Sequence, residues 1–255
     1  MNEQEILQML GEVGAVITDS HIVYTSGRHG TAYVNKDAIY PYTRRTSKLC
    51  RETAEFFAEQ NVEVVVAPAV GGVILSQWTA FHLSEIYDRD VLAVYAERDE
   101  ESLFKADDKS RYELDVTMID PSVGRIRYKT GMLKSDDEVV IKHPGFVIKR
   151  GYDKLVAGKR VLAVEDVATT GGSIKKVIEV TRRCKGNVIG AALLCNRGNV
   201  TPNDIGDPPI LHALLNVKFD SWSEEECRET GPCSRGVNIN TAVGKGKDFL
   251  ARQKG

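Results

Sequence analysis

The residues best suited to chemistry lie close together in the middle of the chain, between Glu165 and Ser173. Glu165 and Asp166 follow the short apolar run 161–164, which is typical of a buried parallel strand. Ligands bind outside the carboxyl ends of such strands, so we expect both carboxylates to face a crevice at that edge. Two adjacent carboxylates can accept hydrogen bonds from two vicinal hydroxyl groups.

The loop that follows the two acids has the composition of an anion-binding site. It contains only small or hydroxyl-bearing residues: Ala168, Thr169, Thr170, Gly171, Gly172 and Ser173. Such residues let backbone N–H groups approach a ligand, and we expect a helix to begin at Ser173 and add its own N–H groups. A ligand that fits both features must carry a phosphate for the loop and two vicinal hydroxyls for the acids. A phosphorylated ribose carries both. The alternative is an ordinary capped strand-to-helix turn with solvated acids.

The surrounding pattern predicts an α/β fold with a doubly wound, mostly parallel sheet. Strand 62–67, helix 73–83 and strand 91–95 form one right-handed crossover unit. After the central strand come helix 173–184 and a buried strand, 188–195, which ends just before Arg197. Arg197 should therefore emerge at the same edge as the two acids.

Three segments lie outside this pattern. Residues 1–43 predict an N-terminal hood that contains an amphipathic helix, 3–11, and a basic hairpin with strands at 22–24 and 32–34. Residues 98–145 predict an enlarged, mobile flap with a small hairpin of its own, because a structureless loop of that length is unusual in a compact domain. We therefore expect one domain, residues 1–219, that includes the hood and the flap.

Residues 220–255 form a polar C-terminal extension, in which Glu224 to Glu226 indicate a solvated helix start. Its Cys227 and Cys233 are the only close pair among five cysteines, an odd number that does not indicate a disulfide framework. No further histidine or cysteine nearby completes a zinc set, so we predict no metal site.

Composition excludes some classes of function. The 255 residues contain 34 Lys and Arg against 36 Asp and Glu, a net charge of -2, so no bulk field recruits nucleic acid or an anionic membrane. We find no signal-peptide pattern at the start and no apolar run near the roughly 18 residues that a membrane span requires. We expect a cytoplasmic protein with no nucleic-acid or membrane partner.

The central stretch resembles the PRPP (5-phosphoribosyl 1-diphosphate) motif of type I phosphoribosyltransferases, and residues 3–197 resemble the orotate phosphoribosyltransferase branch of that family. The resemblance implies that Glu165 and Asp166 bind the ribose hydroxyls and that residues 168–173 enclose the 5′-phosphate. It also places the base against Thr169 and Arg197, with Arg197 facing a carboxylate, a task that suits a planar guanidinium.

Other parts of the resemblance are weaker in specificity. A hood segment of the family, Lys-Ser-Gly-Arg followed further on by Phe-Asn, lies over the base and pyrophosphate. It is matched by Thr25, Ser26, Gly27 and Arg28, with Thr25 in place of the lysine, and by Tyr33, Val34 and Asn35. Ala69, Val70, Gly71 and Gly72 stand where the family has its pyrophosphate loop, but Val70 and Gly71 replace a Tyr-Lys pair. Arg98 matches one basic position of the catalytic loop. The enlarged flap offers five candidates for further pyrophosphate contacts: Lys105, Lys142, His143, Lys149 and Arg150.

The implied reaction transfers a phosphoribosyl group from PRPP to a nitrogenous base, preferably orotate-like, and releases pyrophosphate. Asp166, Glu165 and Arg98 are the expected catalytic residues, Mg²⁺ is bound through PRPP, and the protein is expected to be a homodimer. The alternative is a PRPP-binding regulatory protein without transferase activity, which the lysine-poor loops permit and the lack of a helix-turn-helix disfavours.

Overall fold

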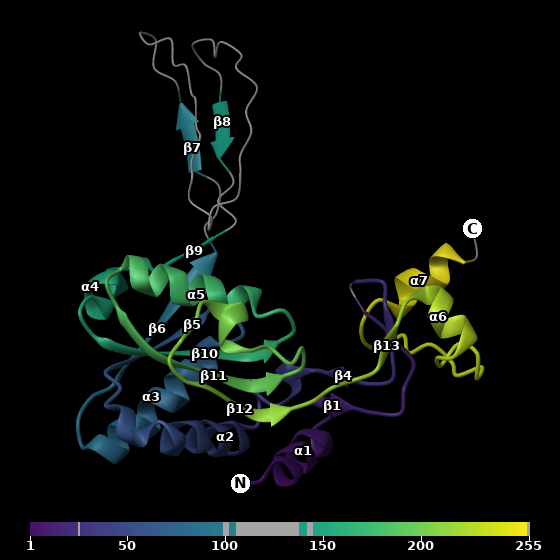
Figure 1. Cartoon of the computed structure of the whole chain (residues 1–255), viewed down its shortest axis with the longest axis horizontal. Coiled ribbons are helices and arrows are strands. Elements are labelled where there is room, and N and C mark those ends of the chain that lie inside the picture. The colour runs from purple at the N-terminus through teal and green to yellow at the C-terminus, as the bar shows by residue number, and fades with distance from the viewer. Residues whose placement is uncertain (25, 99–101, 106–137, 142–144, 254–255) are drawn as a thin grey trace.

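The centre of the molecule is a six-stranded sheet (Figure 1). The structure is a computed structural model that describes residues 1–24, 26–98, 102–105, 138–141 and 145–253. In spatial order the strands are β12 (Leu211–Asn216), β11 (Asn187–Asn196), β10 (Arg160–Ala168), β5 (Val64–Pro68), β6 (Leu92–Arg98) and β9 (Phe146–Val147). The first five are parallel and β9 is antiparallel to β6. The predicted mostly parallel sheet is confirmed.

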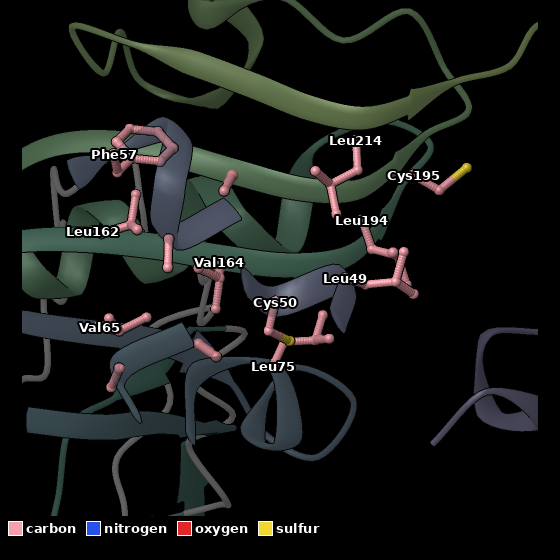
Figure 2. Packing of buried hydrophobic residues seen from close by; sticks show 14 of the residues in the cluster. Leu49, Cys50, Phe57, Val65, Leu75, Leu162, Val164, Leu194, Cys195 and Leu214 are labelled. Carbon is pink, nitrogen blue, oxygen red and sulfur yellow. The ribbon is translucent and has the colours of Figure 1, made fainter. Parts of the chain in front are cut away.

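Helices cover both faces of the sheet, as a doubly wound fold requires. One face packs against α1 (Glu3–Glu12), α2 (Thr43–Phe56) and α3 (Val73–Tyr87), and the other against α4 (Tyr152–Val156) and α5 (Gly172–Arg183). Side chains alternate along β10: Leu162 and Val164 enter the first core, Val161 and Ala163 the second. Figure 2 shows Leu162 and Val164 in that first core with Leu49 and Cys50 of α2.

The predicted helices agree with the structure within a few residues, but the central strand is longer than predicted. α2 is followed by the short 3-10 turn η2 (Ala58–Gln60). β10 continues to Ala168, so Glu165 and Asp166 lie within the strand and not after it. The cause is the neighbouring strand, because Glu165 to Ala168 remain in register with Leu193 to Asn196 of β11. β12 was not predicted at all.

The hood is built from four two-residue strands. β1 (Val16–Ile17) pairs with β4 (Tyr33–Val34), and β2 (Ile22–Val23) pairs with β3 (His29–Gly30). The return strand of the predicted hairpin is therefore 29–30. The strand predicted at 32–34 is present as β4, but it pairs with β1 and not with β2. A tight turn explains the difference: the Tyr24 N–H donates to the Arg28 carbonyl at 2.8 Å, and Gly27 adopts φ +79°. A 3-10 turn, η1 (Lys36–Ala38), follows β4.

The C-terminal extension lies against the hood. Its strand β13 (Ser221–Trp222) pairs with β3, and the helices α6 (Glu224–Glu229) and α7 (Gly246–Arg252) stand beside the hood strands in Figure 1. Ser223 and Glu226 form a capping box at the start of α6, so the predicted helix start is confirmed. Because β13 adds a third strand to β2 and β3, the extension completes the hood sheet.

One further 3-10 turn, η3 (Pro202–Ile205), precedes β12 of the central sheet.

Only part of the predicted flap can be compared with the structure. β7 (Ser102–Lys105) and β8 (Glu138–Ile141) form an antiparallel ribbon, which agrees with the hairpin expected there. Residues 99–101, 106–137 and 142–144 lie outside the described residues, and so do the expectations for Lys142 and His143. Among the described helices, none combines the length and the apolar character that crossing a bilayer demands.

Candidate active site

Asp166 lies at the point where the hood meets the carboxyl end of the sheet. The residue is 5% exposed, and its Oδ2 atom lies 2.8 Å from Lys36 Nζ and 3.4 Å from the Tyr40 hydroxyl. The Val167 N–H donates to Oδ1 at 2.6 Å. Burial alone would lower the pKa of Lys36, but the hydrogen bond and charge of Asp166 outweigh it and raise that pKa. Lys36 is therefore held as a cation against the Asp166 carboxyl group.

Glu165 points to the opposite face of the sheet, as neighbouring strand residues do. The N–H of Ile174, near the start of α5, donates to its carboxyl group. Burial and, to a smaller extent, the charge of Asp166 raise the pKa of Glu165 to about 8, against the opposing effects of Lys36 and of the Ile174 N–H. The two acids therefore differ: Asp166 is paired with a cation, whereas the raised pKa of Glu165 favours its protonated form.

The loop between β10 and α5 has free donors at its helix end. The N-cap residue of α5 is Gly171, at φ +72°, and no side chain caps the helix there. A Cβ on Gly171 would lie 2.5 Å from the Ile205 side chain, so the loop packs tightly against η3 on one side. Ala168 is buried, whereas four residues of the loop are exposed to solvent: Thr169, Thr170, Gly172 and Ser173. This arrangement suits an anion bound by backbone N–H groups.

Arg197 is fixed to this loop by its backbone. The N–H groups of Arg197 and Gly198 both donate to the Ala168 carbonyl, at 2.9 and 3.1 Å. The guanidinium lies over the Tyr24 ring, 4.3 Å from its centroid. Tyr24 in turn donates its hydroxyl to the Ala32 carbonyl at 2.6 Å. Arg197 therefore emerges at the predicted edge of the sheet, between the loop 168–173 and the hood.

The loop 69–72 approaches Asp166 from the neighbouring strand. Its Ala69–Val70 peptide bond is cis, and the Ala69 N–H donates to the Ala96 carbonyl at 2.8 Å. A Cβ on Gly71 would lie 2.1 Å from Asp166 Oδ2 and 2.7 Å from Lys36 Nζ. Only glycine leaves room for this close approach. The Val70 side chain is 86% exposed.

The basic residues predicted from the hood and flap are less closely gathered. Arg28 donates to the Ser221 carbonyl at 2.7 Å and lies 3.5 Å from Glu226, so its guanidinium is held by the extension. Ser26 and Gly27 are exposed on the same turn, and Thr25 lies outside the described residues. Arg98 is exposed at the end of β6, and Arg150 Nε donates to Glu97 at 2.6 Å. Lys149 is also engaged with neighbouring groups.

Three site residues were missed at the sequence level: Lys36, Tyr40 and Tyr24. Lys36 and Tyr40 follow β4, about 130 positions before Asp166, which both contact, and no local spacing signals that contact. The resemblance of Tyr33 to Asn35 to a hood segment of the family stopped one residue before Lys36. A lysine directly after that segment was the available signal.

A separate hollow of about 880 Å³ lies along β12 and α1. It contains none of the predicted site residues, and Glu3, Glu52 and Glu55 line it. Three carboxylates repel a polyphosphate, so this hollow is a poor candidate for a PRPP site.

Comparison with known proteins agrees with this geometry. The family model described as "Phosphoribosyl transferase domain" matches residues 31–209. An orotate phosphoribosyltransferase of Caldicellulosiruptor saccharolyticus is 26% identical over 239 residues, which cover 94% of this chain and 95% of that protein. One from Pelotomaculum thermopropionicum is 30% identical over 89% of this chain and 91% of its own length.

Solved structures show the same fold. The crystal structure of Mycobacterium tuberculosis orotate phosphoribosyltransferase in complex with Fe(III) dicitrate has a TM-score of 0.53 at 18% identity and covers 84% of this chain and 96% of its own. The family match includes the acids of β10, the loop 168–173 and Arg197. The chain belongs to the phosphoribosyltransferase family.

Proposed function

We propose that this protein transfers the phosphoribosyl group of PRPP to a ring nitrogen of an orotate-like base and releases pyrophosphate. The observation that carries the proposal is the grouping of three features at one sheet edge: the Asp166 carboxylate, the uncapped α5 N-terminus and the Arg197 guanidinium. The similarity to orotate phosphoribosyltransferases over about nine-tenths of the chain supports the choice of base.

The two acids have different tasks in this proposal. Asp166 accepts hydrogen bonds from the ribose hydroxyls, and it must exchange part of its contact with Lys36 to do so. Glu165 begins protonated and loses its proton when positive charge approaches. The loop 168–173 binds the 5′-phosphate through backbone N–H groups, and residues 69–72 lie where pyrophosphate leaves.

Mg²⁺ fits this site as part of the substrate. The donors present are hard carboxylate oxygens, which Mg²⁺ prefers, but Lys36 already neutralises Asp166. The described residues therefore offer too few free oxygens to hold the ion alone, which agrees with a metal that arrives on PRPP. When bound, Mg²⁺ would neutralise charge on the leaving pyrophosphate.

Arg197 is the residue that selects the base. Its guanidinium is held in one orientation by the Tyr24 ring and by backbone hydrogen bonds to Ala168. A fixed planar cation can bind a ring carboxylate with two parallel hydrogen bonds. A base without that carboxylate leaves the cation unsatisfied.

We also infer that the active form is a homodimer in the cytoplasm. Val70, Ile74 and Phe81 expose apolar side chains along the start and outer face of α3, which supports an interface there. A substrate with as many phosphate charges as PRPP does not cross a membrane unaided, which supports the location. Light scattering of the purified chain tests the dimer, and a monomer at micromolar concentration contradicts it.

The rival function is that of a PRPP-binding regulator, and one observation favours it. Among the residues that the structure describes, two cations near this site are already paired, since Lys36 contacts Asp166 and Arg150 contacts Glu97. Such a site can bind PRPP without transferring it.

Pyrophosphate release from PRPP and Mg²⁺ with a panel of bases distinguishes the two. We expect release with orotate, little with uracil, adenine or hypoxanthine, and none from the Asp166→Asn variant. PRPP binding by calorimetry without release on any base would support the regulator. Neither binding nor release would overturn both functions.

A further inference from the structure

Four metal-ligating side chains meet between the hood and the C-terminal extension, away from the candidate active site. They are His21, His29, Cys227 and Cys233, and their ligand atoms all lie within 4.8 Å of one another. The first three are buried and Cys233 is half-buried. Such a gathering of two imidazoles and two thiols has no role in phosphoribosyl transfer.

The distances match a tetrahedral ion. The His21 Nε2 atom lies 3.7 Å from Cys227 Sγ and 3.6 Å from Cys233 Sγ, and His29 Nδ1 lies 3.5 Å from Cys233 Sγ. Zinc bonds of about 2.3 Å to sulfur and about 2.0–2.1 Å to nitrogen place such atoms about 3.6 Å apart. The two ring nitrogens are closer, at 2.8 Å, so an ion would move the imidazoles slightly apart.

The groups around the cluster orient the ligands. The other ring nitrogen of His21, Nδ1, faces the Val237 carbonyl at 2.8 Å, which places the proton there and leaves the Nε2 lone pair for a metal. The backbone N–H of Cys233 donates to Cys227 Sγ at 3.3 Å, as expected beside a thiolate. The far nitrogen of His29 is buried, and the described residues provide no hydrogen-bond partner for it. Polar side chains buried with a ring nitrogen left unpartnered are costly, and a bound cation would offset part of that cost.

We propose that His21, His29, Cys227 and Cys233 bind a structural zinc ion. Two sulfur and two imidazole ligands are the set that zinc prefers, and four protein ligands leave no open position for catalysis. The ligands come in two pairs about 200 positions apart, so one ion joins the hood hairpin to the extension. The β13 and β3 pairing and the hydrogen bond from the Asn240 N–H to the His21 carbonyl bring the two halves together.

The ion would also hold the turn that faces the base. His21 and His29 stand on either side of residues 24–28, and Tyr24 of this turn supports Arg197. This consequence rests on the proposed function, whereas zinc binding itself does not. Loss of the ion should therefore raise the KM for the base and leave PRPP affinity nearly unchanged.

The test begins with metal analysis of the full chain, purified under reducing conditions from zinc-supplemented cells. We expect about one zinc per chain and, after exchange to Co²⁺, the intense visible bands of a tetrahedral cobalt site with thiolate ligands. Cys233→Ser should lose the metal. Cys184→Ser is the matched control, because Cys184 is also half-buried but lies outside the cluster, at the end of α5.

Two further measurements test the proposal even if Cys233→Ser fails to fold. Cys233→His keeps a zinc ligand at this position and should retain the ion, and a chelator applied to the unmodified chain should lower its melting temperature and expose the extension to protease. Wild-type protein with free thiols and no zinc would overturn the proposal, as would a disulfide between Cys227 and Cys233 found by mass spectrometry. Since metal content needs no substrate, its failure is separate from failure of the proposed transfer.

Discussion

At the scale of single residues, the site depends on an ion pair placed where a ligand must bind. Lys36 is 31% exposed and Asp166 only 7% by side chain, so removal of the lysine leaves a carboxylate in a poorly solvated place. We expect Lys36→Met to lower the free energy of unfolding by about 1–3 kcal/mol, and Lys36→Met with Asp166→Asn to recover most of that loss.

The surface pair Lys245 and Asp248 provides the control for this cycle. Its Nζ to Oδ2 distance is 3.0 Å, but both side chains are more than half exposed, so Lys245→Met should change stability by no more than about 0.5 kcal/mol. Denaturant unfolding measures both. Equal effects of Lys36→Met and Lys245→Met would show that the Asp166 pair is an ordinary surface contact.

Glu165 predicts a dependence of stability on pH. Its pKa is about 8 in the folded protein against an ordinary 4.5, so the folded state holds more protons than the unfolded state between these values. Stability due to this group therefore falls as pH rises, by about 1.4 kcal/mol per pH unit in that window. Glu165→Gln removes the effect, and we expect the variant to melt higher than wild type at pH 9 and close to it at pH 5.

Exposed Glu59 is the control for this measurement, since Glu59→Gln should shift the melting temperature little at either pH. A gap between Glu165→Gln and wild type that does not widen from pH 5 to pH 9 would contradict a raised pKa. Thermal unfolding followed by circular dichroism suffices.

Arg197 carries the choice of base. If the base bears a carboxylate, Arg197→Ala should lose a charge-assisted contact worth about 1.5–3 kcal/mol, roughly ten- to a hundredfold in kcat/KM, while PRPP affinity barely changes. Steady-state kinetics with orotate, beside calorimetry with PRPP, measures both. Arg44→Ala, an exposed arginine of α2, is the control. An unchanged kcat/KM for orotate in Arg197→Ala removes the carboxylate pocket.

At the scale of elements, two loops and one strand meet so closely that backbone, not side chains, sets the shape of the site. Gly71 touches the Asp166 carboxylate, and a Cβ on Gly198 would lie 1.6 Å from the Thr169 carbonyl. The strand pairing of β10 with β11 fixes these loops relative to one another.

Gly71→Ala tests this closeness. A methyl group 2.1 Å from Asp166 Oδ2 must displace that carboxylate, so we expect PRPP affinity to fall about tenfold, a loss of about 1.4 kcal/mol, with a smaller change in stability. Gly11→Ala in α1 is the control, because nothing lies within 4 Å of its Cβ and alanine favours the helix. Calorimetry that finds equal PRPP affinity in both variants would show that the loop has room to move.

The elements also show where sequence reasoning succeeds. The apolar runs of β5, β10 and β11 and the helix after the Thr-Gly loop were predictable because burial on both faces leaves a continuous hydrophobic signal. β12 was missed because it is an edge strand with a half-buried residue at each of its first three positions. The extent of β10 depended on its neighbour β11, and the hood hairpin on one positive φ at Gly27.

At the scale of the whole molecule, the two ends of the chain form one unit. Asn240 and Lys245 donate backbone hydrogen bonds to His21 and Val23, and β13 extends the sheet of the hood. No sequence spacing signals these contacts, because the partners are about 200 positions apart and each half alone is a short polar segment. The candidate active site was largely predictable as a local motif. The contacts of Lys36 and Tyr24 and the grouping of His21, His29, Cys227 and Cys233 were not, because they join residues far apart in the sequence.

Phe249 of α7 tests how much this closure contributes. Its side chain is 3% exposed, and its ring meets the His29 ring edge-on, with centroids 4.9 Å apart. Phe249→Ala leaves a cavity at the junction of hood and extension, so we expect a loss of about 3 kcal/mol in the free energy of unfolding. Leu155→Ala, which truncates a side chain 41% exposed on α4, should cost less than about 1 kcal/mol.

The position of the destabilised residues in Phe249→Ala is as informative as the loss of unfolding free energy. Because the central sheet has its own two cores, hydrogen exchange in Phe249→Ala should accelerate in residues 21–34 and 220–252 and remain slow in β10 and β11. PRPP should bind nearly as well as in wild type, while the KM for the base rises, since Tyr24 and Arg197 lie on the hood side of the site. Faster exchange spread evenly over the sheet would mean instead that hood, extension and sheet unfold as a single unit.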